Sequence, residues 1–300
     1  MRGNGRYSEP IQMLVMRTGA EELATLTFDA AHRGVLSWNT FAEQGEIAFR
    51  LLDDGMPATP WLKYADWSPH MRRSFSARHD GVNVAVDVIE SADPFDGIEV
   101  RARGVSFHAL SFATPETAQP SLPYAGHARI LDVPARSQYV VEEQRGWCSP
   151  ASLSMLNAYH GLDKDVAETA RAVFDSAYDG TGNWALNVAF SGSLGLRAAV
   201  AYLRNLDHAQ PLIEAGIPLA LSYGWNAGEL PGAPVEHSDG HLAVLCGFTE
   251  SGDCAMNDPA AAHIRAIYPR TTLERIWQRS GCVAYVVAPV GIDFVTLVNA

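Results

Sequence analysis

The residue with the clearest chemical potential is a cysteine at the predicted start of a helix. Cys148 precedes Ser149, a good N-cap residue, and Pro150, which suits the first helical position because its missing N–H costs nothing there. Apolar residues then recur at helical spacing, and Gly161 ends the segment. Backbone N–H groups at a helix start carry partial positive charge and stabilise a thiolate. The pattern is compatible with a nucleophilic cysteine, and a buried structural cysteine fits the segment equally well.

A cysteine nucleophile needs a general base and a group that orients the base. His241 is the best candidate among ten histidines, because it opens the apolar, strand-like run 242–246, which has no evident need for an imidazole. A hairpin turn after this run brings His241 and Asp258 to the same face, whereas a slip of one residue presents Asn257 instead. We favour Asp258, because its charge also stabilises the imidazolium.

Two other interpretations of this histidine stay open. The run His237-Ser238-Asp239-Gly240-His241 contains the ligand types of a zinc site, but three ligands within five loop residues, with no second cluster, are a weak signal. A histidine on an apolar strand can also be a satisfied core residue, and without Cys148 that interpretation is preferred. We therefore predict no metal and no cofactor.

Acyl chemistry also requires donors for an oxyanion. The backbone N–H of Cys148 is one, and a side-chain amide just upstream is the usual second. Both Gln138 and Gln144 are in range, and spacing alone does not choose between them. Three tryptophans are candidates for substrate-binding walls of a cleft, with core packing as the alternative for each. They are Trp147, Trp184 and Trp225.

The elements that position these residues lie in the second half of the chain. Besides the helix after Cys148, helical patterns occupy residues 166–177, 184–194 and 207–215. Short apolar runs predict strands at 196–203, 218–223, 241–248, 254–257 and 283–287. Helices followed by an antiparallel sheet are typical of an α+β domain.

The first part of the chain shows a different pattern, with apolar residues at alternate positions. These runs lie at 47–51, 82–88 and 98–102, separated by Asp-Gly turn signals at 53–55, 80–81 and 96–97. The pattern predicts an N-terminal antiparallel β-sandwich. A proline-rich connector at 115–125 then suggests two domains, residues 1–125 and residues 126–300. Four aromatic residues here could bind a ligand or, as is commoner, fill the core: Trp38, Trp61, Tyr64 and Trp67.

Composition limits the class of protein. The chain has 300 residues, 47% of them hydrophobic, which is enough for a substantial core. A net charge of −12 argues against a nucleic-acid partner, and no apolar run reaches the length of a membrane span. Four cysteines without paired spacing fit a reducing interior. The first twenty residues lack the pattern of a signal peptide, which predicts a cytoplasmic protein, or a secreted one if a leader has been removed.

A set of motifs occurs in a specific order over about residues 130–290. They are Ser137-Gln138, Gly146 to Met155, Gly182-Asn183-Trp184, Ala215 to Leu219, Ser238 to Leu242, Asn257 to Ala260 and Tyr268-Pro269-Arg270. In order and spacing they resemble the papain-fold cysteine peptidases. The closest resemblance is to the bacterial group related to the double-glycine leader peptidases, family thirty-nine of the cysteine peptidases.

The resemblance implies a papain-like domain with Cys148 as nucleophile, His241 as base and Asp258 as orienting acid. It favours Gln138 as the oxyanion glutamine, although its interval to Cys148 is longer than the short papain-type one. An inserted loop is then needed, and Gln144 stays its rival. The Ser-Trp-Asn sequence at residues 37–39 is similar to an element of β-rich N-terminal extensions found in some members.

We therefore expect a cysteine hydrolase, a peptidase that cleaves peptide amides of a peptide or protein substrate through a thioester acyl-enzyme. Two competing hypotheses remain. A Cys-His-Asp set also serves acyltransferases and transglutaminase-like enzymes. The chain could also be a non-catalytic binding protein on the same fold.

Overall fold

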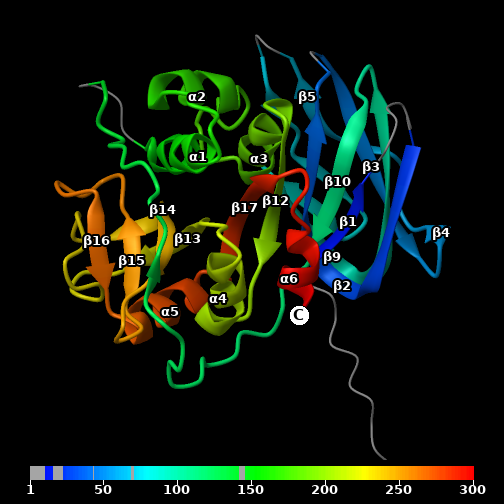
Figure 1. Cartoon of the computed structure of the whole chain (residues 1–300). Helices are drawn as coiled ribbons and strands as arrows, with labels where there is room; N and C mark the ends of the chain where they lie inside the picture. Colours follow the sequence, from blue (N-terminus) through cyan, green and yellow to red (C-terminus); the bar gives the residue numbers. More distant parts are fainter. Residues whose placement is uncertain (1–10, 16–22, 43, 69–70, 142–145) are drawn as a thin grey trace, which may run out of the picture.

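The computed structural model describes residues 11–15, 23–42, 44–68, 71–141 and 146–300. Within these residues, helices and strands form an α+β fold, as predicted, and the strands lie in two large antiparallel sheets (Figure 1). The first sheet is built from the N-terminal part of the chain, and the second carries the residues singled out for chemistry.

The strands of the first sheet are β1 (Ile11–Val15), β2 (Leu23–Thr40), β3 (Gly45–Asp53), β4 (Met56–Pro57), β5 (Leu62–Trp67), β6 (Arg73–Ser74), β7 (Ala77–His79), β8 (Val82–Ala85), β9 (Val88–Arg103) and β10 (Phe107–Ala113). Those of the second are β11 (Arg129–Ile130), β12 (Leu196–Tyr202), β13 (Leu219–Trp225), β14 (Ser238–Phe248), β15 (Cys254–Asn257), β16 (Arg265–Tyr268) and β17 (Val283–Pro289). The helices are α1 (Cys148–Tyr159), α2 (Val166–Val173), α3 (Trp184–Ser193), α4 (Leu206–Glu214), α5 (Arg270–Arg279) and α6 (Phe294–Asn299).

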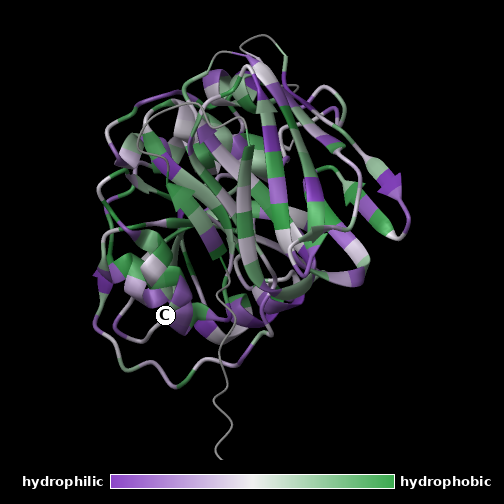
Figure 2. Cartoon of the chain, turned by 90° about the vertical axis from the view of Figure 1, so that its right-hand side faces the viewer, coloured by the Kyte–Doolittle hydropathy of each residue, from purple (hydrophilic) through white to green (hydrophobic). Residues whose placement is uncertain are grey.

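The N-terminal strands form one continuous sheet of ten strands rather than the two separate sheets of the predicted sandwich. Its main path runs β1-β10-β2-β9-β3-β5-β6. The long strands β2 and β9 pair along most of their length, with register shifts between Thr27 and Arg33. Irregularities of this kind bend a sheet. Because β2 and β9 run through the bend, they contribute to the two halves of the sheet that lie on either side of it. Figure 2 shows hydrophobic and hydrophilic residues following one another along these strands.

The two halves of this bent sheet face each other across an aromatic core. The ring of Trp38 on β2 packs edge-on against Tyr64 and Trp67 on β5, with centroids 6.0 and 6.1 Å apart. All three side chains are buried, which is the core role rather than the ligand-binding role. Trp61 is only partly buried, and the guanidinium groups of two arginines lie over its ring.

Two sequence predictions for this sheet are wrong. The alternating run 82–88 is not one strand, because a turn at Val86 and Asp87 separates β8 from β9. The Asp96-Gly97 signal is not a turn, because β9 continues through it. At Gly97 the absent side chain lets the carbonyl of Leu26 and the side chain of Leu52 approach closely.

The second sheet has the order β12-β17-β13-β14-β15-β16, with β11 beside β14. In the view of Figure 1, α1, α2 and α3 lie above its strands and α4 and α5 below. The predicted helices and strands occur here, although α2 ends at Val173, before its predicted end. The sequence analysis missed β11, β16, α5 and α6. No described helix is both long and apolar enough to cross a membrane.

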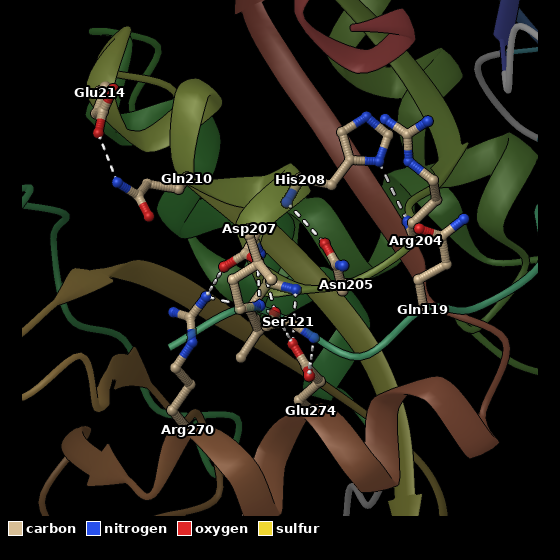
Figure 3. A network of polar contacts seen from close by, with 12 residues as sticks. Gln119, Ser121, Arg204, Asn205, Asp207, His208, Gln210, Glu214, Arg270 and Glu274 are labelled. Carbon is tan, nitrogen blue, oxygen red and sulfur yellow. Dashed lines mark hydrogen bonds and ion pairs between the residues drawn. The ribbon is translucent and has the colours of Figure 1, made fainter. Parts of the chain in front are cut away.

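The predicted connector at 115–125 has no regular secondary structure, but buried polar contacts fix it to the second sheet's helices (Figure 3). The carboxylate of Glu274 on α5 accepts hydrogen bonds from the backbone N–H of Ser121, at 2.9 Å, and of Leu206, at 3.0 Å. Arg270 pairs with Asp207 beside it, at 2.6 Å. The connector is thus a fixed part of the fold.

Two polar residues of β2 join the sheets directly. Asn39 donates from Nδ2 to the carbonyl of Ala198 at 2.8 Å, and its Oδ1 accepts from the N–H of the same residue at 2.9 Å. Ser37 accepts from the N–H of Val200 at 3.2 Å. Gly192 on α3 lies so close that a Cβ there would stand 2.6 Å from the Asn39 Cβ. These contacts explain why the polar side chains of the Ser-Trp-Asn sequence at residues 37–39 are buried. The division into two domains at residue 125 stays a prediction.

Candidate active site

Cys148 is the first residue of α1, and its side chain is partly buried. The prediction that Ser149 caps this helix is wrong, because the N-cap is Trp147 and no side chain caps it. Ser149 instead forms a buried hydrogen bond with the hydroxyl of Tyr285 at 2.9 Å. Pro150 remains compatible with the first turn, where N–H groups have no intrahelical partner. The thiol accordingly stands where the helix presents free N–H groups.

His241 lies on β14, opposite Tyr223 of β13, and its side chain is close enough to that of Cys148 for each group to shift the pKa of the other. The rings of Tyr223 and Trp225 pack edge-on against the imidazole, with centroids 5.9 and 5.5 Å away. The ring is buried, with a relative exposure of 5%. Aromatic packing on this scale excludes water and limits the orientations that the ring can adopt.

Asp258 follows β15 and is fully buried beside His241. Its Oδ1 lies 2.8 Å from Nε2 of His241 and accepts the N–H of Ala260 at 3.0 Å. Its Oδ2 accepts the hydroxyl of Tyr268 at 2.8 Å. Asn257 pairs with Val244 across the hairpin, so side-chain alternation turns Asp258 to the face of His241.

The alternative partner, Asn257, has another use. Its Nδ2 donates to the carbonyl of Val133 at 3.0 Å, and its Oδ1 accepts from Arg265 at 2.6 Å. The structure thus places Asp258, rather than Asn257, against the imidazole. Nε2 of His241 is taken by this bond, which leaves Nδ1 for the thiol.

The three groups shift one another's protonation. Burial disfavours a charged thiol, but His241 and the N–H groups of Leu242 and Ser149 outweigh it and hold the pKa of Cys148 below its ordinary value. Burial also disfavours an imidazolium, but Asp258 and Cys148 raise the pKa of His241 to about 10. Burial acts to raise the pKa of Asp258, yet the net shift is downward because of His241. Thiolate and imidazolium therefore coexist over a broad pH range.

The remaining cysteines differ in both exposure and protonation. Cys246, Cys254 and Cys282 are free and buried. Burial raises the pKa of Cys246 and of Cys282 to about 12, and it also raises that of Cys254. Cys148 is thus the one described cysteine whose pKa is shifted down.

The two candidate oxyanion glutamines have different outcomes. Gln138 is buried, and its backbone N–H donates to the carbonyl of Pro259 at 2.9 Å, one residue after Asp258. Its Oε1 has no hydrogen-bond partner among the described residues, and Gln138 is not part of the cleft lining. Gln144 lies outside the described residues.

A cleft of about 1200 Å³ opens over Cys148 and His241. Trp147 and Trp184 are among the residues that line it. Trp225 does not, because it is buried behind His241 and donates from Nε1 to the carbonyl of Val235 at 3.2 Å. For Trp225 the packing role is therefore the correct alternative.

A metal site at the 237–241 run has no support in the geometry. In the part of the chain that the structure describes, no group of three or more His, Cys, Asp or Glu side chains gathers in a way that could hold a metal ion. His241 is instead committed to Asp258 and Cys148.

The sequence analysis missed two contributions to the site. Tyr268 was noted only as part of a motif, although its hydroxyl holds Asp258. The turn at Val86 and Asp87, from the N-terminal sheet, lines the same cleft as Cys148. The positions of these residues depend on tertiary packing, for which local sequence gives no signal.

A family model matches the part of the chain that carries these residues. A model described as the Peptidase_C39 like family matches residues 130–285, which include Cys148, His241 and Asp258. None of the curated proteins compared matches the chain.

Two solved structures are similar to part of the chain. A protein described as a C39-like peptidase from Bacillus anthracis is 18% identical, with a TM-score of 0.43, over 54% of this chain and 98% of that one. A double glycine motif protease from an AMS/PCAT transporter, in complex with the leader peptide, is 17% identical, with a TM-score of 0.37, over 57% of this chain and 100% of that one. Since the family model spans more than half of the 300 residues, the chain belongs to the C39-like peptidase family.

Proposed function

We propose that this protein is a cysteine peptidase in which Cys148 is the nucleophile, His241 the general acid and base, and Asp258 the group that orients the imidazole. The observation that carries the proposal is the convergence of the three residues: Cys148 and His241 line one cleft and shift each other's pKa, and Asp258 is hydrogen-bonded to His241. The three residues come from a helix start, a strand and the end of a neighbouring strand. Membership in a peptidase family supports the same chemistry.

The arrangement also supports a papain-like interpretation of the second part of the chain. The helix that begins with Cys148 packs against the sheet, where Ser152 donates to the carbonyl of Leu242 at 3.0 Å. The next residue back on that strand is His241, so this contact fixes the distance between helix and base. Thiolate and imidazolium are thereby held in register before substrate binds.

The reaction proceeds in two steps. The Cys148 thiolate attacks the carbonyl carbon of a peptide bond, and a C–S bond forms as the carbonyl oxygen becomes an oxyanion. His241 gives its proton to the departing amine as the C–N bond breaks, which leaves a thioester. Water then attacks the thioester, His241 accepts its proton, and the thiolate leaves with the imidazolium restored.

The oxyanion requires donors in the first step. The N–H of Cys148 at the helix start is one, and we assign the amide of Gln138 as the second. Support for Gln138 comes from its bond to the carbonyl of Pro259, which holds its backbone next to Asp258. Because Gln138 lies outside the cleft lining in this structure, its side chain has to turn toward Cys148 to donate. Loss of one oxyanion donor typically lowers kcat about 10²–10³-fold, which is the effect expected for Gln138→Ala.

Hydrolysis of a synthetic peptide mixture, followed by mass spectrometry, tests the proposal. We expect cleavage by the wild type, none by Cys148→Ala, and full cleavage by Cys246→Ala, which removes a buried thiol from the strand that carries His241. A parallel reaction with glycine amide as acceptor distinguishes hydrolysis from acyl transfer, because transfer yields the amide adduct. Equal amounts of product from the wild type and from Cys148→Ala would show that Cys148 is not the nucleophile.

A further inference from the structure

The cleft over Cys148 is not built by the peptidase-family region alone. Residues 85–88, the turn between β8 and β9 of the N-terminal sheet, line it together with the segments around Cys148 and His241. This turn lies outside residues 130–285, the part of the chain that the family model matches. The N-terminal sheet therefore supplies a wall that the family region does not contain.

The conformation of this turn is unusual for its sequence. Val86 has a φ of 60°, whereas Asp87, the other residue of the two-residue loop, is not in the positive-φ region. Type II′ hairpins share this pattern, and their first central residue is normally glycine. A β-branched residue with positive φ is strained, and such strain is found mainly at functional sites. A valine at this point places an apolar side chain on the cleft where glycine would place none.

Two buried carboxylates join the segment 175–184, which forms another part of the wall, to the N-terminal sheet. Asp87 accepts a hydrogen bond from the backbone N–H of Trp184, the first residue of α3. Asp175 accepts the N–H of Ser74 on β6 at 3.0 Å, and its other oxygen accepts from Asn183 at 2.9 Å. Both ends of the segment 175–184 are thereby fixed to the N-terminal sheet. The wall is consequently preformed.

Several side chains on this wall are apolar or aromatic, beside charged ones such as Arg171 and Asp179. Phe174 and Tyr178 are 42% and 50% exposed, which is high for aromatic residues, and both line the cleft with Val86 and Trp184. Exposed apolar side chains that converge on a cleft are typical of a pocket for an apolar group.

We propose that Val86, with Phe174, Tyr178 and Trp184, forms an apolar subsite that selects peptides with a large apolar side chain close to the scissile bond. The inference rests on the proposed peptidase function and deepens it, because it assigns substrate selection to the N-terminal sheet. Val86 is a specificity-determining residue here and takes no part in the bond-breaking steps.

The test compares cleavage preferences of full-length variants on a synthetic peptide mixture that contains every residue type at each position. Val86→Gly removes the side chain and suits the positive φ, so it should fold at least as well as the wild type. Val86→Asn also tolerates this φ and makes the wall polar. Asp54→Gly is the matched control, because Asp54 is another residue with positive φ in a turn of the same sheet, between β3 and β4, and does not line the cleft.

We expect the wild type to prefer large apolar residues, and both Val86 variants to lower the apolar-to-polar ratio of kcat/KM by about tenfold. Asp54→Gly should leave that ratio unchanged. A wild type without apolar preference, or an unaltered ratio in both Val86 variants, would overturn the subsite while leaving the peptidase proposal intact. No cleavage by the wild type beyond the Cys148→Ala level would overturn the peptidase proposal, and the subsite with it.

Discussion

Oδ1 of Asp258 stands 2.8 Å from Nε2 of His241, and both side chains are buried. A buried carboxylate at this distance stabilises the imidazolium and so keeps its proton at neutral pH. The same bond fixes the ring with Nδ1 toward the Cys148 thiol. The protonation state of the site and the orientation of its base thus depend on one contact.

The pH dependence of peptide hydrolysis should reflect this contact. The active form needs the thiolate of Cys148 and the proton of His241, and the two titrate as a coupled pair. Because the pKa of His241 is raised to about 10, kcat/KM should stay high through neutral pH and fall as pH rises through about 10. On the acid side, kcat/KM should fall at a pH below the ordinary pKa of a thiol, because the pKa of Cys148 is lowered. An alkaline limb near pH 7 would contradict the raised pKa.

Substitution of Asp258 should impair chemistry more than folding. Asp258→Asn keeps the size of the side chain but removes the negative charge, so we expect kcat to fall by about 10²–10⁴-fold. Tyr268→Phe removes only the hydroxyl that donates to Oδ2 and should lower kcat much less. Circular dichroism controls for the fold. Full activity in Asp258→Asn would show that the orienting acid is misassigned.

Asp87 should make stability depend on pH. Burial raises the pKa of Asp87 to about 7, above the unfolded value of about 3.9, so its contribution to stability is complete below pH ~4 and is lost as pH rises through 7. Asp87→Asn stays neutral and can still accept the N–H of Trp184. From pH 5 to pH 8, the free energy of unfolding of the wild type should fall by about 3 kcal/mol relative to that of the variant, because only the wild type has a group that titrates at this position. Urea denaturation at both pH values measures this difference, and parallel pH slopes would refute the effect.

The contact between the sheets offers a separate test of stability. Asn39→Ala removes two buried hydrogen bonds and leaves the N–H and C=O of Ala198 without these partners, at an expected cost of about 2–4 kcal/mol. Gly192→Ala should also destabilise, because its Cβ would stand 2.6 Å from that of Asn39. Asn83→Ala, at a partly buried position on β8, serves as the control. Denaturation midpoints that are equal for Asn39→Ala and Asn83→Ala would show that the contact is unimportant for stability.

The candidate cysteine and histidine could be picked out from the sequence, because each lies at the start of a local pattern. A cysteine before a helical run and a histidine before an apolar strand are both visible in sequence. Side-chain alternation left both Asp258 and Asn257 open, and Asp258 was favoured for its charge. In the structure, a register shift in the hairpin between Leu245 and Gly247 sets the pairing that turns Asp258 to the face of His241. Helix boundaries were less secure, since Ser149 forms a bond to Tyr285 instead of capping α1.

The contribution of the N-terminal sheet was not predictable by the same means. Val86 continues an apolar alternation, and nothing in that pattern indicates that its φ is positive. The Asp-Gly pair at 96–97 was wrongly predicted to form a turn. In sequence, a glycine that allows close packing within a strand cannot be distinguished from one that allows a turn. The contact of Asp87 with Trp184 joins residues 97 positions apart, which only tertiary packing can define.

The measurement that tests the central claim most directly is the rate of alkylation of each cysteine by iodoacetamide, followed by mass spectrometry from pH 5 to pH 10. We expect Cys148 to react at pH 6 at least about 100-fold faster than Cys246, Cys254 and Cys282, and His241→Ala to lose most of that rate at pH 6. The variant is essential, because it leaves Cys148 at the same helix start and removes its partner. A Cys148 that reacts equally fast at pH 6 with and without His241, or only as pH approaches 9, would contradict an activated thiolate.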